Sequence, residues 1–397
     1  MSEERIYWLA WAQIPGIGPI LLQRMQAQFG SVAAAWTAPA TALAEVEGFG
    51  RQTVEKVIKY RSSINPTQFY QQHLEKNPQF WTPADPEYPH LLLETASPAP
   101  VLYYRGQIDR EENLGNRPLI GIVGTRKPTE YGKYWTRRLS YILGKQGFTI
   151  VSGMAAGIDT AAHQGCLEGG GRTIAVFGTP LDKIYPEQNR PLAGQICHQG
   201  VLLSEHPYGT KTLAGHFPQR NRIIAGISRA VLVMEAPNQS GSLITARLAN
   251  EFGRDVYALP GRIDDANSQG CLRLLKNGAE AILSEDELLA SLGAIPQLDA
   301  PQPPTLEKPD FSGESFLAPK LEPKKLVAEP EKSVTPLPDL EPELKQVLEA
   351  TPPNPIPFDL IVEETGLPSG NVSSALLHLE LLGLVSQLPG MRYQRCI

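Results

Sequence analysis

Apolar and polar residues alternate in short blocks along the middle of the chain, and these blocks indicate strands and helices in turn. The strand-like blocks are almost wholly apolar and occupy residues 118–123, 148–153, 173–178, 201–205, 230–236 and 255–261. Helical spacing separates them at residues 130–146, 157–168, 188–198, 218–228 and 241–252. Because near-continuous apolar strands are buried on both faces, the alternation predicts an α/β fold with a mostly parallel sheet and helices on both sides.

The pattern changes on either side of this region. Residues 1–67 are helical in pattern with glycine-centred turns, which predicts a small all-α N-terminal domain before an α/β domain over residues 68–293. Residues 294–343 are rich in proline and acidic side chains and predict an extended linker. The last predicted domain, residues 344–397, has the pattern helix, helix, turn, helix and short strands.

Several predicted strands end in small or polar residues. These ends are Gly124-Thr125-Arg126, Ser152-Gly153, Gly178-Thr179 and Ser204-Glu205. Open parallel sheets bind ligands at the carboxyl ends of their strands, so we expect the functional site at this edge.

The first of these ends has the residues of a phosphate-binding turn. Gly124 lets an anion approach the backbone, the next helix offers N–H groups, and Arg126 adds a bidentate guanidinium beside Thr125. The Gly-x-Gly-x-x-Gly and Gly-x-x-x-x-Gly-Lys-Ser/Thr patterns are missing, so neither a dinucleotide site nor an ATP-hydrolysing loop is supported. A plain strand-to-helix turn with a solvated arginine is the alternative.

Arg220, Asn221 and Arg222 stand at the predicted start of a helix, because the proline two residues before them suits a first turn. Cations at a helix N-terminus oppose the helix dipole, and a bound anion would reverse the sign of that interaction. Two guanidinium groups and an amide suit phosphate oxygens, so we expect these residues to bind phosphate. The alternative is an internal network of the arginines with Glu205 and Glu235.

Aromatic side chains accompany these polar segments. Phe217, just before the arginines, is a candidate either for stacking on a base or for core packing. Tyr185 lies in the polar loop 178–189 with Asp182 and Asn189. There it can stack on a base, or the loop's side chains can simply hold the loop in place.

Two further segments have a binding or catalytic interpretation beside a structural one. Ser240, Gly241 and Ser242 begin a predicted helix, whose N-terminus can bind an anion. Asp159 and His163 share one helical face, so they are either an acid–base pair or a structural hydrogen-bonded pair in a closely packed helix.

Charge is distributed unevenly along the chain. The whole sequence has a net charge of −6, yet residues 117–290 contain 19 basic against 15 acidic side chains. Residues 206–234 contain no carboxylate, whereas Lys211 and three arginines are present. Basic residues gathered on one part of an acidic protein favour a polyanion as partner.

Other classes of protein are disfavoured. The four cysteines are scattered without a Cys-x-x-Cys pair, which argues against a zinc site or a disulfide framework and suits a reducing cytoplasm. The N-terminus does not have the pattern of a signal peptide, and no run approaches the ~18 consecutive apolar residues of a membrane span. From these features we expect a soluble cytoplasmic protein. Motifs of catalytic nucleophiles and of metal ligands are also missing, so we expect no catalytic residues, metal or cofactor.

The two ends carry motifs of their own. Residues 14–19 and 46–50 are apolar-glycine turns that resemble the helix-hairpin-helix element, which offers backbone N–H groups to nucleic-acid phosphate; a compact helical domain that does not bind DNA is equally compatible. Residues 356–385 resemble a winged helix-turn-helix with residues 369–382 as its recognition helix. That helix contains Glu380 and no lysine or arginine, so a protein contact or self-association is preferred to reading of a DNA groove.

The motifs of the α/β region are similar, in unbroken order, to those of the DNA-processing protein A family, also called DprA or Smf. They are GIVGTR (121–126), SGMAAGID (152–159), GTPLDKIYPEQN (178–189), SEHP (204–207), FPQRNRIIAGIS (217–228), EAPNQSGSLITA (235–246) and GCLRLLKNGA (270–279). The helical and winged-helix ends also fit a layout of that family. The resemblance implies an extended Rossmann-like fold that binds single-stranded DNA, forms a homodimer and loads the RecA recombinase during natural transformation.

Residue by residue, the resemblance places Arg126 and the Arg220-Asn221-Arg222 segment at the DNA, with Lys211 in the basic loop before that segment. Two positions depart from the family's pattern. Thr125 stands where serine is commoner, and Pro180 stands where a second glycine is usual, which puts close approach of a ligand to the backbone in doubt at that turn.

The sequence therefore favours a non-enzymatic mediator that binds single-stranded DNA and transfers it to a recombinase. The alternatives are a nucleotide-processing enzyme, of the phosphoribohydrolase type acting on nucleoside monophosphates, and a winged-helix transcription regulator. The first lacks its Pro-Gly-Gly-x-Gly-Thr-x-x-Glu run here, and the poorly basic recognition helix argues against the second. The predicted DNA-binding residues are Gly124, Thr125, Arg126, Lys211, Phe217, Arg220, Asn221, Arg222, Ser240, Gly241 and Ser242.

Overall fold

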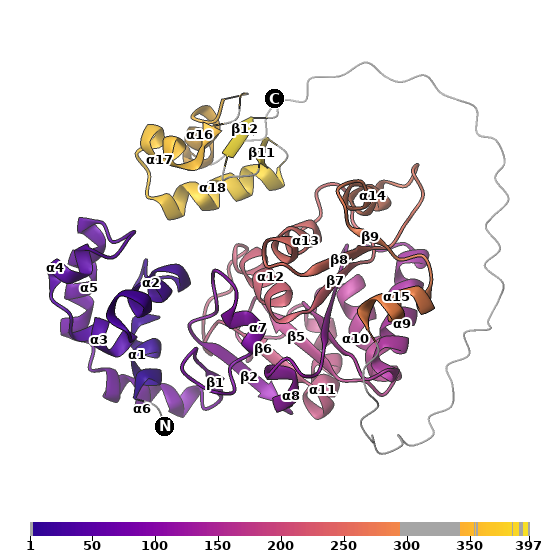
Figure 1. Cartoon of the computed structure of the whole chain (residues 1–397), viewed down its shortest axis with the longest axis horizontal. Coiled ribbons are helices and arrows are strands. Elements are labelled where there is room, and N and C mark those ends of the chain that lie inside the picture. The colour runs from indigo at the N-terminus through magenta and orange to yellow at the C-terminus, as the bar shows by residue number, and fades with distance from the viewer. Residues whose placement is uncertain are drawn as a thin grey trace. The chain divides into compact units, whose positions relative to one another are not determined.

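The chain divides into two compact units, Met1–Pro296 and Gln297–Ile397 (Figure 1). The computed structural model describes residues 3–293, 342–352, 354, 356–382, 384–388 and 392–395. The predicted linker over residues 294–343 thus lies almost wholly outside the described residues. Among the residues that are described, no helix is long and apolar enough to cross a bilayer.

The first unit begins with a helical domain. Its helices are α1 (Glu4–Trp11), α2 (Pro19–Phe29), α3 (Val32–Thr37), α4 (Ala40–Ala44), α5 (Arg51–Ser63) and α6 (Pro66–Lys76). Trp11 and Trp36 pack edge to face in its core, with ring centroids 5.1 Å apart. The predicted apolar-glycine turns precede α2 and α5, and each requires glycine because Gly16 and Gly48 have φ values of +90° and +89°.

Helix α6 crosses the predicted domain boundary at residue 67 and leads into the α/β domain. Arg5 of α1 joins the two domains. Its guanidinium carbon lies 4.2 Å from the centroid of the Phe80 ring, and Nε lies 3.5 Å from a carboxylate oxygen of Asp85. These contacts fix the helical domain against the α/β domain.

A nine-stranded sheet forms the centre of the α/β domain, in the order β1-β2-β6-β5-β4-β3-β7-β8-β9. The strands are β1 (Phe80–Trp81), β2 (Leu102–Gly106), β3 (Leu119–Val123), β4 (Thr149–Ser152), β5 (Thr173–Phe177), β6 (Val201–Ser204), β7 (Ala230–Val233), β8 (Asp255–Ala258) and β9 (Glu280–Ala281). The strands from β6 to β9 in this order are parallel, whereas β1 and β2 pair antiparallel at one edge.

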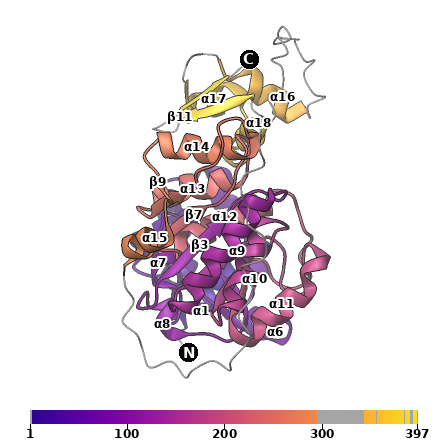
Figure 2. The ribbon, with the colours of Figure 1, turned by 90° about the vertical axis from the view of Figure 1, so that its right-hand side faces the viewer.

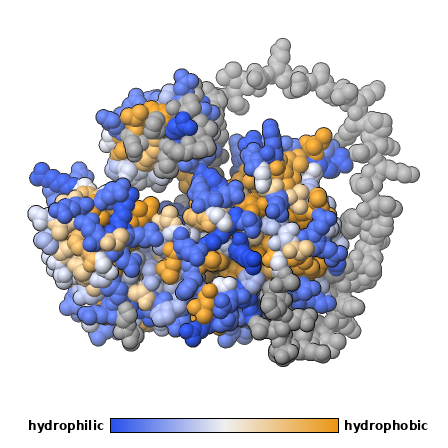
Figure 3. All heavy atoms as spheres, in the orientation of Figure 1, coloured by the Kyte–Doolittle hydropathy of each residue, from blue (hydrophilic) through white to orange (hydrophobic). Residues whose placement is uncertain are grey.

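Helices cover both faces of the sheet (Figure 2). One face packs against α9 (Glu130–Lys145), α10 (Ile158–Glu168), α11 (Arg190–Gln199) and α15 (Glu285–Leu292). The other packs against α7 (His90–Leu93), α12 (His216–Ile227), α13 (Ser242–Glu251) and α14 (Gln269–Lys276). Helix α8 (Arg110–Asn113) precedes β3, and the 3-10 turns η1 (Glu187–Asn189) and η2 (Ala266–Ser268) precede α11 and α14. Figure 3 shows hydrophilic residues over much of the visible surface, with apolar residues in smaller groups between them.

The predicted mostly parallel α/β fold is confirmed, and the predicted strands correspond to β3 to β8. Alternate residues of β3 show why its apolar run is continuous: Leu119 packs toward α12, and Ile120 packs toward α9. Strands β1, β2 and β9 are missing from the prediction. Two of them have only two residues each, and β2 ends in the polar Arg105 and Gly106, so none has a long apolar run.

The second unit is a winged-helix domain. It contains α16 (Pro342–Glu349), α17 (Phe358–Thr365), α18 (Ser369–Leu381) and an antiparallel sheet in the order β10 (Ile356–Pro357), β12 (Arg392–Arg395) and β11 (Val385–Leu388). Its core includes Val347 of α16, Ile361 of α17 and Leu376 of α18. Helix α18 occupies the predicted recognition-helix position.

Candidate nucleic-acid interface

The predicted strand ends gather at the carboxyl edge of the sheet. Strands β3 and β7 are parallel neighbours, but β3 continues into α9 on one face and β7 into α13 on the other. Open α/β sheets bind ligands where the strand order reverses in this way. Loops leave this edge at residues 124–129, 153–157, 178–186, 205–215 and 234–241.

The turn after β3 is held by the strand beside it. Thr125 N–H donates to Glu235 O at 2.7 Å, and a Cβ on Gly124 would lie 2.8 Å from the same oxygen. The Glu235 carboxylate, whose pKa burial raises, accepts from the N–H and the hydroxyl of Thr129 at 2.9 and 3.2 Å. Because Thr129 caps α9, this carboxylate occupies the helix start where the sequence analysis placed an anion. Arg126 and Lys127 are the exposed cationic groups of the turn.

Arg220 lies inside the protein. The residue is only 5 % exposed, and its Nη1 donates to the carbonyl oxygen of Gly153 at 2.5 Å and to that of Val176. These carbonyls stand at the carboxyl ends of β4 and β5, which the guanidinium joins. Burial lowers the pKa of Arg220 to about 10, and the nearby Asp159 carboxylate opposes the shift. Arg220 therefore stabilises the strand ends from beneath the surface.

Asn221 and Arg222 also have internal partners. Arg222 forms an ion pair with Glu205 and donates from Nη1 to Ser97 O at 2.5 Å. The Asn221 amide donates to Gly241 O at 3.2 Å, which links α12 to the turn before α13. The internal-network alternative is thus confirmed for Arg222 with Glu205. Direct DNA contact by Asn221 and Arg222 stays a prediction.

Arg126 lies beside two aromatic rings from distant segments. Its guanidinium carbon is 5.8 Å from the centroid of the Phe217 ring, which is 5.5 Å from the centroid of the Tyr185 ring at an interplanar angle of 49°. Tyr185 is 50 % exposed, Phe217 is half-buried and Arg126 is exposed. These three residues are termed the aromatic–arginine platform. They present π-faces and one positive charge at the same place.

Tyr185 is missing from the set of predicted DNA-binding residues. The signal for it in the sequence was an aromatic residue in a polar loop that follows a predicted strand. Its proximity to Phe217 and Arg126 is a tertiary contact between two loops and the first turn of α12, which the local pattern does not show.

The first part of the carboxylate-free segment, residues 206–215, forms a loop that exposes Lys211. At its two ends, His206 and His216 stack with ring centroids 3.9 Å apart and an interplanar angle of 21°. Burial lowers the pKa of His206 to about 4, so this ring is uncharged near neutral pH. Gly209 N–H donates to Asp182 Oδ2 at 3.2 Å, which links the loop to the one that carries Tyr185.

Two polar segments hold loops in place. The hydroxyls of Ser240 and Ser242 bond to each other at 2.7 Å, and Ser242 is buried while Gly241 between them is exposed. Asn189 donates from Nδ2 to Met154 O at 2.9 Å, so its role in the 178–189 loop is structural. Anion binding by the serine turn stays a prediction.

Asp159 and His163 each bond to other partners. His163 Nδ1 lies 2.7 Å from the hydroxyl of Thr173, and that hydroxyl donates to Ile150 O, so Nδ1 carries the proton. Asp159 accepts from Ala155 N–H at 3.2 Å. Both residues are buried, and burial lowers the pKa of His163 to about 3 and raises that of Asp159. They stabilise α10 separately rather than as an acid–base pair.

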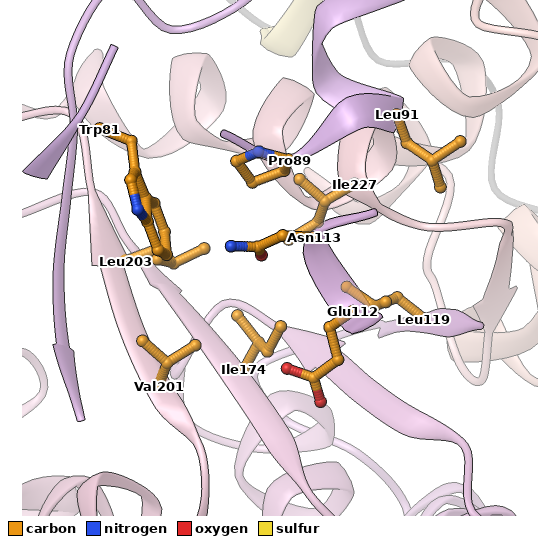
Figure 4. A pocket seen from close by; sticks show the side chains of 10 residues that line it. All are labelled: Trp81, Pro89, Leu91, Glu112, Asn113, Leu119, Ile174, Val201, Leu203 and Ile227. Atoms are coloured by element: carbon orange, nitrogen blue, oxygen red, sulfur yellow. The ribbon is translucent and has the colours of Figure 1, made fainter. Parts of the chain in front are cut away.

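A small cavity lies at the opposite edge of the sheet (Figure 4). Leu119, Ile174 and Val201, at or near the amino ends of their strands, line it. Its volume of about 10 Å³ has room for at most about one water. The carboxylate of Glu112, in the wall of the cavity, accepts a hydrogen bond from Arg172 Nε at 2.8 Å. Glu112 therefore belongs to a structural ion pair. Among the described residues, no group of histidine, cysteine and acidic side chains could hold a metal ion.

The family model of DNA recombination-mediator protein A matches residues 79–293, which is more than half of the chain. The chain belongs to this family. The model of the DprA winged helix domain matches residues 330–391, in agreement with the fold of the second unit. The DprA family predicted from the motifs is therefore confirmed, and as a member of it the protein is a mediator of DNA recombination.

Individual DprA-family relatives extend this match. Protein Smf of Synechocystis is 54 % identical in an alignment of 401 positions that covers 99 % of each chain. Protein Smf of Escherichia coli is 37 % identical over 321 residues, 80 % of this chain and 78 % of its own. The X-ray structure of DNA processing protein A from Streptococcus pneumoniae has a TM-score of 0.63 and 33 % identity, and covers 73 % of this chain and 98 % of that chain.

Proposed function

We propose that this protein binds single-stranded DNA at the carboxyl edge of its sheet and loads the RecA recombinase onto that DNA, without catalysing a reaction itself. The observation that carries the proposal is the aromatic–arginine platform, in which Arg126 lies 5.8 Å from the Phe217 ring and Tyr185 is half exposed beside it. Bases of a single strand stack on such rings whatever their identity, which contributes roughly 1–3 kcal/mol per base. Bases of a duplex are already stacked on one another, so the single strand is preferred.

Charge supports the same assignment. Lys127, Lys183 and Lys211 are exposed on loops of this edge, as is Arg126. Cations that neutralise phosphates release counterions, so binding weakens as the salt concentration rises. The buried Arg220 holds the strand ends from which these loops leave. We therefore assign phosphate contacts to the exposed cations and a supporting role to Arg220.

The winged-helix domain has another role in this proposal. Residues 342–395 contain three basic and six acidic side chains, and α18 carries Glu380 but no lysine or arginine. Phosphate neutralisation needs cations, so this helix is poorly suited to a DNA groove. We assign it to a protein contact or to self-association. Action in the cytoplasm as a homodimer completes the proposal, and it is supported by the DprA-family membership.

Fluorescence anisotropy with labelled oligo-dT of about 20 nucleotides tests the DNA proposal. The wild type should bind the single strand more tightly than a duplex of the same length. Arg126→Ala should weaken binding and reduce the slope of log K against log salt by about 0.7, the contribution of one phosphate contact. Phe217→Ala should weaken binding with an unchanged slope, because the ring carries no charge. Lys145 is an exposed cation at the far end of α9, so Lys145→Ala should leave both the affinity and the salt slope unchanged.

Equal affinity for single strand and duplex, or unchanged binding in both platform variants, would reject the proposal. Turnover of nucleoside monophosphates by the wild type would favour the nucleotide-processing alternative. Recombinase loading is tested separately, by following RecA filament formation on DNA coated with a single-strand-binding protein. This protein should shorten the lag before filaments form, and Arg126→Ala should lengthen it again. Sedimentation equilibrium tests the homodimer.

A further inference from the structure

An open groove of about 600 Å³ lies between the helical domain and the loop that carries Lys211. On one side it is lined by Gln13 and by side chains of α6, among them Phe69 and His73. Tyr208, which is 37 % exposed, lines the other side. The volume falls within the range of roughly 300–1,000 Å³ that is usual for ligand pockets.

The lining of the groove suits bases better than phosphates. The rings of Phe69 and His73 lie 5.7 Å apart, and burial lowers the pKa of His73 to about 4, so its ring is neutral near pH 7. The charges of the lining balance, because Glu75 stands beside Lys76. The His73 ring packs against the rings of Phe80 and Tyr103, and its Nε2 lies 3.0 Å from the Tyr103 hydroxyl. The exposed Tyr208 ring therefore supplies the stacking face, and the glutamine amides supply hydrogen-bonding groups for base edges.

The groove is connected to the aromatic–arginine platform through two hydrogen bonds of one loop. Tyr208 N–H donates to Asn77 Oδ1 at 2.8 Å, next to the end of α6. The following residue, Gly209, donates its N–H to Asp182 Oδ2 at 3.2 Å. Asp182 lies in the loop that carries Tyr185 of the platform. The loop that carries Lys211 therefore links the wall of the groove to the loop of the platform within the first unit.

We propose that this groove holds bases of the same single strand that lies on the platform, so that one DNA strand contacts both the α/β domain and the helical domain. This inference rests on the proposed function. It assigns the helical domain a contact with bases through the groove beside α6, separate from its glycine turns.

The test compares Tyr208→Ala with the wild type on labelled oligo-dT of increasing length, from about 6 to about 24 nucleotides. The ratio of variant to wild-type Kd should be near one for the shortest oligonucleotide that binds. It should rise to at least about fivefold for the long ones, the loss of one stacked base. Tyr208→Phe keeps the ring and should keep the wild-type ratio at every length.

A second pair of variants covers the other wall of the groove. Gln72→Glu places a negative charge on the exposed side of α6, and Gln146→Glu places the same charge after the far end of α9. Only Gln72→Glu should weaken binding, and only for long oligonucleotides. A ratio that does not change with length in Tyr208→Ala and Gln72→Glu would overturn the groove proposal. Failure of the wild type to bind any single strand would instead reject the proposed function, and the groove proposal with it.

Discussion

The guanidinium carbon of Arg126 lies 5.8 Å from the ring centroid of Phe217. Arg126 belongs to the turn after β3, whereas Phe217 lies in the first turn of α12, which precedes β7. The contact exists because α12 begins at the carboxyl edge of the sheet, where Phe217 also lies against Gly178 at the end of β5. It joins a positive charge to a stacking surface, the two properties that binding of a single strand without sequence preference requires.

A double-mutant cycle tests whether Arg126 and Phe217 act on the same nucleotide. If they do, the binding loss in the double variant Arg126→Ala/Phe217→Ala should differ from the sum of the two single losses by about 0.5–1 kcal/mol, the value of a cation–π contact. Anisotropy titrations of the four proteins with the same oligonucleotide measure it. Strict additivity would show that the two side chains contact separate nucleotides.

Arg220→Met should reduce the stability of the fold, because Arg220 is buried and does not form part of the exposed platform. The variant keeps much of the apolar volume but leaves the carbonyls of Gly153 and Val176 without their donor, so we expect the free energy of unfolding to fall by about 3 kcal/mol. Urea denaturation measures this change. Arg126→Ala, at an exposed position, should unfold like the wild type. Wild-type stability of Arg220→Met combined with lost DNA binding would make Arg220 a direct contact.

Two glycines in helices should respond to alanine in opposite directions. A Cβ at Gly165 of α10 would lie 2.2 Å from Arg137 O of α9, and a backbone oxygen cannot easily move away, so Gly165→Ala should cost about 1–3 kcal/mol. Gly194 of α11 has open space around its Cβ position, so Gly194→Ala should add about 0.5–1 kcal/mol. Chemical denaturation of both variants checks the signs. Equal effects would contradict the close packing of α9 on α10.

The buried His163 should make the protein less stable in mild acid. In the unfolded chain its pKa is near 6.5, whereas burial lowers the folded pKa to about 3, so the unfolded state binds more protons between these values. The free energy of unfolding should therefore decrease as the pH is lowered below about 6.5. This group contributes up to about 1.4 kcal/mol per pH unit. His163→Asn keeps a donor for Thr173 but does not titrate. A plot of its free energy of unfolding against pH should have a smaller slope than that of the wild type, by an amount that corresponds to at most about one proton.

Urea denaturation at about pH 5, 6 and 7 measures these slopes for wild type and variant. His73 and His206, with folded pKa values lowered to about 4, contribute in the same direction in both proteins, so the difference between the slopes isolates His163. Identical slopes would show that His163 takes up its proton normally in the folded state.

Removing residues 294–397 should leave binding of short oligo-dT within about twofold of the wild type, because the platform lies wholly in the first unit. The winged-helix domain is acidic, with three basic against six acidic side chains in residues 342–395, so we expect it to contribute little to phosphate binding. Anisotropy of the shortened protein measures this. A loss larger than tenfold would place DNA contacts in the second unit.

The fold could be predicted from the sequence where burial is local and regular. Strands β3 to β8 are buried on both faces, so each has an apolar run that shows in the sequence. The edge strands β1 and β9 are too short for any pattern, and they pair only because the rest of the sheet is already present.

The candidate site could be predicted only in part. Arg126 follows a predicted strand and Arg220 begins a predicted helix, and residue type and local context predicted contact with DNA for both. The structure separates them: Arg126 is exposed, whereas Arg220 is 5 % exposed and bonded to two carbonyls. Arg222 is engaged by Glu205 in the same way. Sequence patterns indicate that a guanidinium needs a partner, but not whether the partner is a ligand or the protein itself.

By itself, the sequence determined the alternation of strands and helices, the edge at which the polar loops gather and the family to which the chain belongs. These follow from residue type and order along the chain. Only the tertiary structure decided that Arg126, Tyr185 and Phe217 form one platform and that Arg220 lies beneath it. The physical reason is that contacts between distant loops depend on the order of strands in the sheet, and local periodicity carries no information about that order.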